Sequence, residues 1–222
     1  GCEYATIFSG FGRTKVYLID KGNRILPFED EDVVRIIERN MENNGVHIHR
    51  NSRLVSMKTI NDRVEYELEF TDGRHETFNV EKALISVGRV SNLEGLWADE
   101  VGISMGKRGI DNNDTQTNVD NIYAVGDLTA DISLVNVGEL EGRYAVERIF
   151  GQPDRKLVYE NISTIMFLSP EVAGVGLNET QAREKGLDYK VVTLEYATIP
   201  RAIAKRNTQG FIKLLVTNDA HM

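Results

Sequence analysis

The chain has 222 residues, 41% of them hydrophobic and 27% charged, a composition typical of a globular protein with a sizeable core. The formal net charge is −8, and 26 basic residues are scattered among 34 acids, which argues against a nucleic-acid partner because such binding needs a basic stripe. No apolar run approaches the roughly 20 residues of a membrane helix, and no signal peptide is visible. We therefore expect a cytoplasmic protein without a membrane partner.

The first 50 residues predict a parallel α/β unit. Residues 2–11 are apolar at helical spacing, and residues 16–19 form a short apolar run, typical of a strand buried on both faces. Asp30 can cap a second helix, and a further strand begins at Val46. Helix, strand, helix and strand in this order indicate a parallel sheet. The apolar positions of the first helix are Tyr4, Ile7, Phe8 and Phe11.

The middle of the chain changes to a period of two. Residues 64–70 alternate between apolar and charged types, and a turn signal follows at residues 71–73. This pattern predicts an antiparallel hairpin with one face exposed to solvent. Residues 83–87 return to a continuous apolar strand that ends at Gly88. We expect an antiparallel insertion within a doubly wound sheet.

A third region begins with an apolar run at residues 122–125. The run ends in Gly126 and Asp127 and leads through a loop to a helix. Residues 151–153, Gly-Gln-Pro, contain the residue types that interrupt regular structure and are the best candidate for a domain boundary. The predicted apolar face of the helix consists of Val137, Leu140, Tyr144 and Ile149.

The last region predicts an α+β fold. The pair Asn178 and Gln181 fits a capping box that opens a short helix. Residues 191–194 and 211–216 read as strands. The last strand stops at residues 219–222 with no terminating element, as though cut within a hairpin.

Metal and thiol chemistry have little support. Cys2 is the only cysteine, which excludes a disulfide framework and any CxxC site within these residues. We interpret His47 and His49 as solvent-facing strand histidines rather than as metal ligands, and we predict no metal site.

The start of the chain holds half of a dinucleotide fingerprint. Gly1 opens the first helix, in the place of the glycine that lets the helix pack closely on its strand. Asp20 ends the following strand, where an acid grips a ribose 2′-hydroxyl. The carboxylate would repel a 2′-phosphate, which favours NAD over NADP, although Lys21 and Arg24 soften that preference. Taken alone, the pattern also fits an ordinary helix and strand.

Several stretches, in order, resemble the pyridine nucleotide-disulfide oxidoreductase family. The first is similar to the nicotinamide-binding domain of dihydrolipoamide dehydrogenases and soluble pyridine nucleotide transhydrogenases. The others resemble the strand whose glycine lies against the nicotinamide nucleotide, the flavin segment, and the opening of the dimer-interface domain. The stretches are residues 1–8 with 16–20, 83–89, 121–127 and 169–176.

The resemblance implies an α/β fold: a Rossmann-like NAD-binding domain with an antiparallel insertion over 1–115, a returning segment of the FAD-binding domain over 116–152, and part of an α+β dimerisation domain over 153–222. It implies FAD and NAD as cofactors and a homodimer in the intact family member. The family's upstream flavin glycine motif, redox cysteine pair and C-terminal His-Glu pair are absent. We therefore expect a fragment without the N-terminal FAD-binding part and the C-terminal end, inactive alone.

The resemblance also implies site residues, none of them catalytic. Glu3 would orient the nicotinamide carboxamide, a role compatible with that of a first-turn acid favourable to the helix dipole. Leu54 would contact the adenine side, although an ordinary apolar strand residue explains it equally well. Gly1, Asp20 and Gly88 would complete the nicotinamide nucleotide site. Asp127 would hold the flavin ribityl chain. The start of the next helix would face the flavin pyrimidine edge, through Ser133, Leu134, Val135 and Asn136.

The implied function is hydride transfer between NAD(H) and flavin, as in dihydrolipoamide dehydrogenase. Two alternatives stay open: a soluble pyridine nucleotide transhydrogenase, and a non-catalytic nucleotide-binding fragment. Residues 1–8 favour the transhydrogenase and residues 199–202 the dehydrogenase. Asn136 stands where dihydrolipoamide dehydrogenases commonly have histidine, which leaves the subgroup open.

Overall fold

The computed structural model describes residues 1–96, 98–129, 132–151 and 156–218, and the chain divides into two compact units. Unit 1 comprises Gly1–Ser86 and Ser163–Met222, and unit 2 comprises Val87–Ile162. The mixed α/β class predicted from the sequence is confirmed. The abrupt end predicted for the final strand, at residues 219–222, lies outside the described residues. None of the described helices is long and apolar enough to span a membrane.

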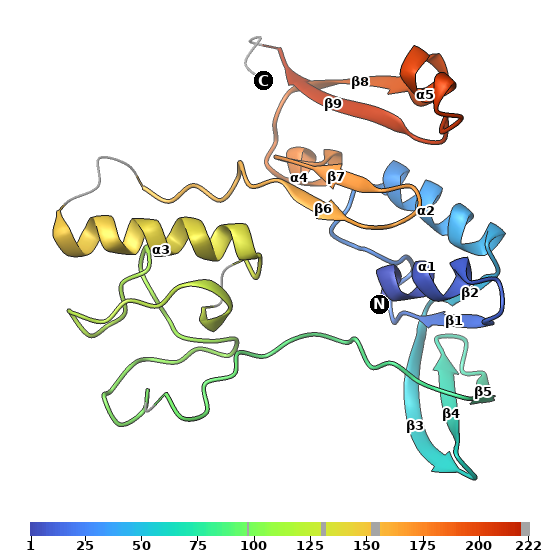
Figure 1. The fold of residues 1–222 in the computed structure, drawn as a ribbon, viewed down its shortest axis with the longest axis horizontal. Coiled ribbons are helices and arrows are strands. Elements are labelled where there is room, and N and C mark those ends of the chain that lie inside the picture. The colour runs from blue at the N-terminus through green and yellow to red at the C-terminus, as the bar shows by residue number, and fades with distance from the viewer. Residues whose placement is uncertain (97, 130–131, 152–155, 219–222) are drawn as a thin grey trace. The chain divides into compact units, whose positions relative to one another are not determined.

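Unit 1 opens with the predicted parallel α/β unit. Its elements are α1 (Cys2–Gly10), β1 (Val16–Ile19), α2 (Glu31–Asn43) and β2 (Val46–His49). β1 and β2 pair in parallel and lie side by side in Figure 1. Helix α2 begins where predicted, because the Asp30 side chain accepts a hydrogen bond from the Asp32 amide at 3.0 Å.

The core of unit 1 joins its two chain segments. Leu168 and Val172, from the second segment, pack against residues of both helices and of β2. Burial of these apolar side chains stabilises the unit by about 25 cal/mol for each Å² removed from water. The buried residues are Ala5, Ile25, Val34, Ile37, Met41, Val46, Leu168 and Val172.

The predicted burial of β1 on both faces is wrong. Three of its side chains are half-buried and that of Ile19 is 36% exposed. The apolar positions of α1 also face outward, since Tyr4 is 53% exposed and Phe11 66%, whereas Ala5 and Ser9 are buried. Over the described ranges, the parallel sheet has only two strands, and the core cluster of this unit does not include Tyr4, Phe11 or Ile19.

The strand predicted at residues 83–87 is also wrong, because this segment has no regular structure. Leu84 is 57% exposed and Val87 is 93% exposed. A strand requires a neighbour that pairs with its N–H and C=O groups. Within the described part of the chain, no strand pairs with this segment.

The antiparallel insertion is confirmed as a sheet with the order β3-β4-β5 (Figure 1). The strands are β3 (Ser52–Ile60), β4 (Arg63–Phe70) and β5 (His75–Val80). The predicted hairpin corresponds to β4 and β5, and it buries Tyr66 and Leu68 as its alternating pattern indicates. The pattern did not reveal β3, because only Ser52 of that strand is buried.

An aromatic cluster joins the insertion to the parallel strands. The ring of Tyr66 stacks on Phe78 with centroids 5.1 Å apart, and Phe78 meets His49 edge-on at 5.0 Å. Tyr17 of β1 stacks on His49 at 5.8 Å. His49 is therefore half-buried rather than solvent-facing, and burial lowers the pKa of its imidazole. His47 is exposed, as predicted.

Unit 2 contains η1 (Gly126–Leu128) and the predicted helix, α3 (Val135–Phe150). The predicted apolar face of α3 is right at Val137 and Tyr144, which are buried. It is wrong at Ile149, which is 52% exposed, and the buried face instead includes Glu141. The predicted boundary at residues 151–153 lies partly outside the described residues.

The second segment of unit 1 has the predicted α+β character. Antiparallel pairs form between β6 (Thr164–Met166) and β7 (Val172–Gly174), and between β8 (Tyr189–Glu195) and β9 (Phe211–Thr217). The capping box of Asn178 and Gln181 opens α4 (Glu179–Glu184) as predicted. The short helices η2 (Tyr196–Thr198) and α5 (Pro200–Ala204) connect β8 to β9.

Tyr66 provides a test of this packing. Its hydroxyl is buried and has no hydrogen-bond partner among the described residues, and burial raises the pKa of Tyr66 to about 12. Removal of an unsatisfied buried hydroxyl relieves a desolvation cost, so Tyr66→Phe should raise the free energy of unfolding by about 1 kcal/mol. Urea denaturation measures the change. As a control, Tyr189→Phe removes a hydroxyl that donates to the Glu179 carbonyl at 3.3 Å, and it should be destabilising. An equal loss in both variants would contradict the prediction.

Candidate functional site

Gly1 lies at a close approach between the start of α1 and two neighbouring segments. A Cβ atom on Gly1 would lie 2.8 Å from Ser86 Oγ and 3.8 Å from a methyl carbon of Leu18. The absence of a side chain thus lets the helix start lie directly against β1 and the end of the 83–86 segment. This is the packing that the dinucleotide fingerprint requires of its third glycine.

Asp20 follows β1 at the carboxyl end of the parallel pair. Its amide donates to the His49 carbonyl at 2.9 Å, and its carbonyl accepts from the Ser52 amide at 3.2 Å, so its backbone is fixed. Asp20 Oδ1 accepts from the Gly22 amide at 2.7 Å. Asp20 Oδ2 has no hydrogen bond within the described ranges and is open to an added hydroxyl donor.

The Arg24 guanidinium is bonded to carbonyl groups of its own loop. It donates to the carbonyls of Pro27 at 2.9 Å and Glu29 at 3.0 Å. These bonds hold the loop that leads to α2. A cation that could offset the Asp20 carboxylate beside a 2′-phosphate is thereby occupied elsewhere.

The Glu3 carboxylate makes a contact that the sequence did not reveal. Glu3 Oε1 accepts from the Phe167 amide at 2.9 Å, which ties the first turn of α1 to the chain just after β6. Leu54, opposite Leu68 in the insertion, is 43% exposed and lies beside a bulge in β3. Burial raises the pKa of the Cys2 thiol, which lowers the reactive thiolate fraction and suits a packing role.

The other predicted site residues belong to unit 2. Gly88 has φ +146°, a conformation that favours glycine. Asp127 lies in η1, and its carbonyl accepts from Ser91 Oγ at 2.7 Å. Its carboxylate is 60% exposed, with Arg89 Nη1 at 3.6 Å from Oδ2. The backbone at Asp127 is therefore held, while the carboxylate faces solvent.

The start of α3 presents backbone N–H groups. Leu134 is the N-cap in an extended conformation and makes no side-chain capping bond. Val135 is 92% exposed, and Ser133 and Asn136 are also exposed. A helix of 16 residues with such a start carries a partial positive charge there, which suits an electron-rich or anionic group.

The structure thus sorts the predicted residues into two groups. The first, in unit 1, comprises Gly1, Glu3, Asp20 and Leu54. The second, in unit 2, comprises Gly88, Asp127, Ser133, Leu134, Val135 and Asn136.

The pyridine nucleotide-disulphide oxidoreductase family model matches residues 1–142, and the model of that family's dimerisation domain matches residues 162–221. The chain belongs to the pyridine nucleotide-disulphide oxidoreductase family. Family membership accounts for both the α/β unit and the α+β segment that packs on it.

Named relatives in this family are dihydrolipoyl dehydrogenases. One from Bacillus subtilis is 35% identical over 99% of the chain and 47% of its own length. One from Geobacillus stearothermophilus is 32% identical over 99% of the chain and 46% of its own length. The chain spans about half the length of the curated relatives it matches.

A solved structure of this family shares the fold. It is the HOCl-induced flavoprotein disulfide reductase RclA from Escherichia coli, with a TM-score of 0.88 and 29% sequence identity. The match covers 98% of the present chain and 49% of RclA.

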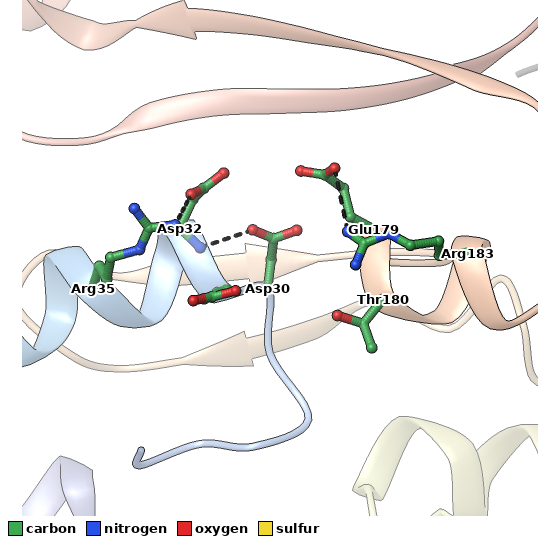
Figure 2. Close-up of a pocket in the computed structure, with 7 residues that line it drawn as sticks. Asp30, Asp32, Arg35, Glu179, Thr180 and Arg183 are labelled. Carbon is green, nitrogen blue, oxygen red and sulfur yellow. Dashed lines mark hydrogen bonds and ion pairs between the residues drawn. The ribbon is translucent and has the colours of Figure 1, made fainter. Parts of the chain in front are cut away.

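A pocket of about 200 Å³ lies where the first turn of α2 faces the start of α4 (Figure 2). Carboxylate oxygens of Asp30, Asp32 and Glu179 lie within 4.8 Å of one another, a grouping that could hold a cation. The ammonium group of Lys213, from β9, supplies the positive charge. Lys213 Nζ lies 2.8 Å from Asp30 Oδ1 and 2.7 Å from Asp32 Oδ2, and it also pairs with Glu179.

The environment shifts the pKa values of this cluster. Burial alone would raise the pKa of Asp30, but hydrogen bonds from Lys213 and the Asp32 amide outweigh it and hold that pKa below its usual range. Burial likewise opposes the charge of Lys213, and its three carboxylate partners raise its pKa. The cluster links the region of the main family match to the dimerisation region, and the 183-residue separation of Lys213 from Asp30 hid it from sequence reasoning.

Removal of Lys213 should destabilise unit 1. The Lys213 side chain is 8% exposed, and Lys213→Met leaves its carboxylate partners uncompensated. We expect a loss of about 2–3 kcal/mol in the free energy of unfolding, reduced from the value for a fully buried pair by the exposure of Asp32. Lys190→Met, an exposed lysine on β8, is the matched control and should change stability by less than about 0.5 kcal/mol.

The stabilisation that Lys213 provides should depend on pH. Since the pKa of Asp30 is depressed on folding, its contribution is present above the ordinary carboxyl pKa of 3.8 and is lost as the pH falls through the folded value. Denaturation curves of the wild type and Lys213→Met should therefore converge below about pH 4. A constant difference down to acid pH would rule out the ion pairs as its cause.

Proposed function

We propose that this chain forms the NAD-binding region, the returning flavin segment and the dimerisation region of an FAD-dependent oxidoreductase. The enzyme passes a hydride between NAD(H) and flavin, as a dihydrolipoyl dehydrogenase does, acts as a homodimer, and works in the cytoplasm. The observation that carries the proposal is the match of the family model and its dimerisation model over residues 1–142 and 162–221.

The domain division that we propose is 1–115 for the NAD-binding domain, 116–152 for the flavin segment and 153–222 for the dimerisation domain. The family models support the last boundary, because one match ends at residue 142 and the other begins at residue 162. The names of the relatives, dihydrolipoyl dehydrogenase and flavoprotein disulfide reductase, favour electron transfer over simple nucleotide binding.

On the nicotinamide side, Asp20 is the residue that selects the nucleotide. Its fixed backbone and open Oδ2 suit acceptance of a hydrogen bond from a ribose hydroxyl. Gly1 lets α1 begin directly against β1, and the N–H groups at this helix start favour a pyrophosphate. Glu3 would lie at the nicotinamide end of this nucleotide and Leu54 at its adenine end. Gly88 is a further predicted contact of the nicotinamide nucleotide.

On the flavin side, Asp127 would accept from hydroxyls of the ribityl chain. The uncapped start of α3, at residues 133–136, would place N–H donors against the pyrimidine edge of the flavin. When bound, the flavin supplies the hydride chemistry, and these donors favour its reduced, more negative form. The interaction of a helix start with a negative charge contributes up to about 2 kcal/mol. These donors therefore adjust the reduction potential of the flavin, while the hydride chemistry belongs to the cofactors.

The flavin role of Asp127 predicts a loss of FAD affinity in Asp127→Asn. Asparagine replaces the charged acceptor with a neutral amide that has one acceptor oxygen instead of two. This change should weaken FAD binding about tenfold or more in the full-length protein. Titration of the deflavinated protein with FAD, followed by flavin fluorescence, measures the dissociation constant. Asp120→Asn, an exposed acid of unit 2, is the control and should bind FAD normally. Equal affinity in all three proteins would exclude Asp127 as a flavin ligand.

The role of Asp20 predicts a change in nucleotide preference. Asp20→Ala should weaken NADH binding about tenfold, because a ribose hydroxyl loses a charged acceptor. Binding of NADPH should not weaken, because the variant also removes a repulsive charge. The ratio of the two dissociation constants is measured by titration, with the exposed Glu81→Ala as the control. An unchanged ratio, or NADPH bound more tightly than NADH by the wild type, would refute the assignment.

A further inference from the structure

Glu141 is a carboxylate buried in unit 2. It lies on the inner face of α3 with only 1% of its surface exposed, among apolar neighbours such as Val137 and Tyr144. An acidic side chain is almost never buried without partners, because a desolvated charge is costly. Over the described ranges, no Lys, Arg or His side chain forms an ion pair with it. Its partners are therefore hydrogen-bond donors.

Both carboxylate oxygens of Glu141 are used. Oε2 accepts from the Gly126 amide at 2.6 Å, and Oε1 accepts from the Tyr159 hydroxyl at 2.9 Å. The Tyr159 bond fixes the orientation of the carboxyl group, so that its other oxygen faces the turn at Gly126. Hydrogen bonds to a charged acceptor are about twice as strong as neutral ones.

The turn at Gly126 lies directly against the same face of α3. Gly126 has φ +69°, in the left-handed region. A Cβ on Gly138 would lie 3.2 Å from the Gly126 Cα, so a glycine at 138 leaves the room that the turn needs. Gly138 and Glu141 are three residues apart and hence share one helix face. The carbonyl of Gly126 is also bonded, since it accepts from the Thr129 amide at 3.0 Å.

We propose that Glu141 is a positioning residue: it holds the Gly126 peptide against α3 and thereby sets the direction in which Asp127 presents its carboxylate to the flavin ribityl chain. The proposal rests on the proposed flavin role of Asp127. Asp127 directly follows the anchored peptide, and its own carboxylate is 60% exposed and ready to accept. Glu141 does not contact the cofactor and acts only through the turn.

The test compares Glu141→Leu, which removes the acceptor, with Glu141→Gln, which keeps a carbonyl oxygen for the Gly126 amide. In the full-length protein, Glu141→Leu should weaken FAD binding about tenfold or more, whereas Glu141→Gln should stay within about threefold. Glu139→Ala is the matched control, since Glu139 is a 62% exposed acid on the same helix. Amide exchange at Gly126 should accelerate in Glu141→Leu alone among these variants.

A double-mutant cycle separates this inference from the proposed function. If Glu141 acts through Asp127, then Glu141→Leu should add less than about threefold in an Asp127→Asn background. Full additivity, or normal FAD affinity in Glu141→Leu, overturns the positioning role while Asp127→Asn alone still reports on the flavin site. Normal affinity in Asp127→Asn overturns the proposed role of Asp127 itself.

Gly138→Ala keeps the inference testable if Glu141→Leu fails to fold. The added methyl group favours the helix but displaces the Gly126 turn. FAD binding should weaken about threefold or more while the melting temperature of the deflavinated protein does not fall. Unchanged FAD affinity in this variant would show that the close approach of the turn to α3 is not needed for binding.

Discussion

Unit 1 depends on one buried ammonium group. The starts of α2 and α4 favour acidic residues because of the helix dipole, and the fold brings these two starts together around Asp30, Asp32 and Glu179. Three carboxylates at such a distance repel one another unless a cation lies between them. Lys213 of β9 supplies that cation. Charge as well as apolar packing therefore fixes the second chain segment on the first.

The local patterns of the sequence predicted much of this fold. Asp30 is recognisable as a helix cap because capping depends on residues two or three positions away. Residues 64–70 are recognisable as a strand because the alternation of apolar and charged residues indicates a half-buried sheet face. The strand prediction for residues 83–87 was wrong because a strand depends on a partner far away in the sequence. Apolar continuity shows that a segment can be buried in a sheet, but strand formation depends on a neighbour that pairs with it, and periodicity carries no information about that neighbour.

The candidate site shows the same division. Asp20 and Asp127 could be found because each follows a short apolar run. The contacts around them could not be found, because they depend on the folded chain. The Gly22 amide donates to Asp20, and the Glu141 carboxylate accepts from the Gly126 amide next to Asp127. One signal was available: Glu141 interrupts the predicted apolar face of α3 between Val137 and Tyr144. A charged residue on an otherwise buried face requires a hydrogen-bonding or charged partner, so its position in the sequence already indicates that such a contact exists.

The discontinuity of unit 1 has a consequence for the order in which the protein matures on the ribosome. Unit 2 is encoded by one uninterrupted stretch, Val87–Ile162, whereas unit 1 needs Ser163 onward to complete its core. Asp30 is synthesised 183 residues before Lys213. Domains generally fold as units during synthesis. Unit 1 therefore cannot complete its core until after the whole of unit 2 has been synthesised. Until β9 emerges, the acidic starts of α2 and α4 lack their shared cation, and the nascent chain exposes the apolar surface that the second segment will cover.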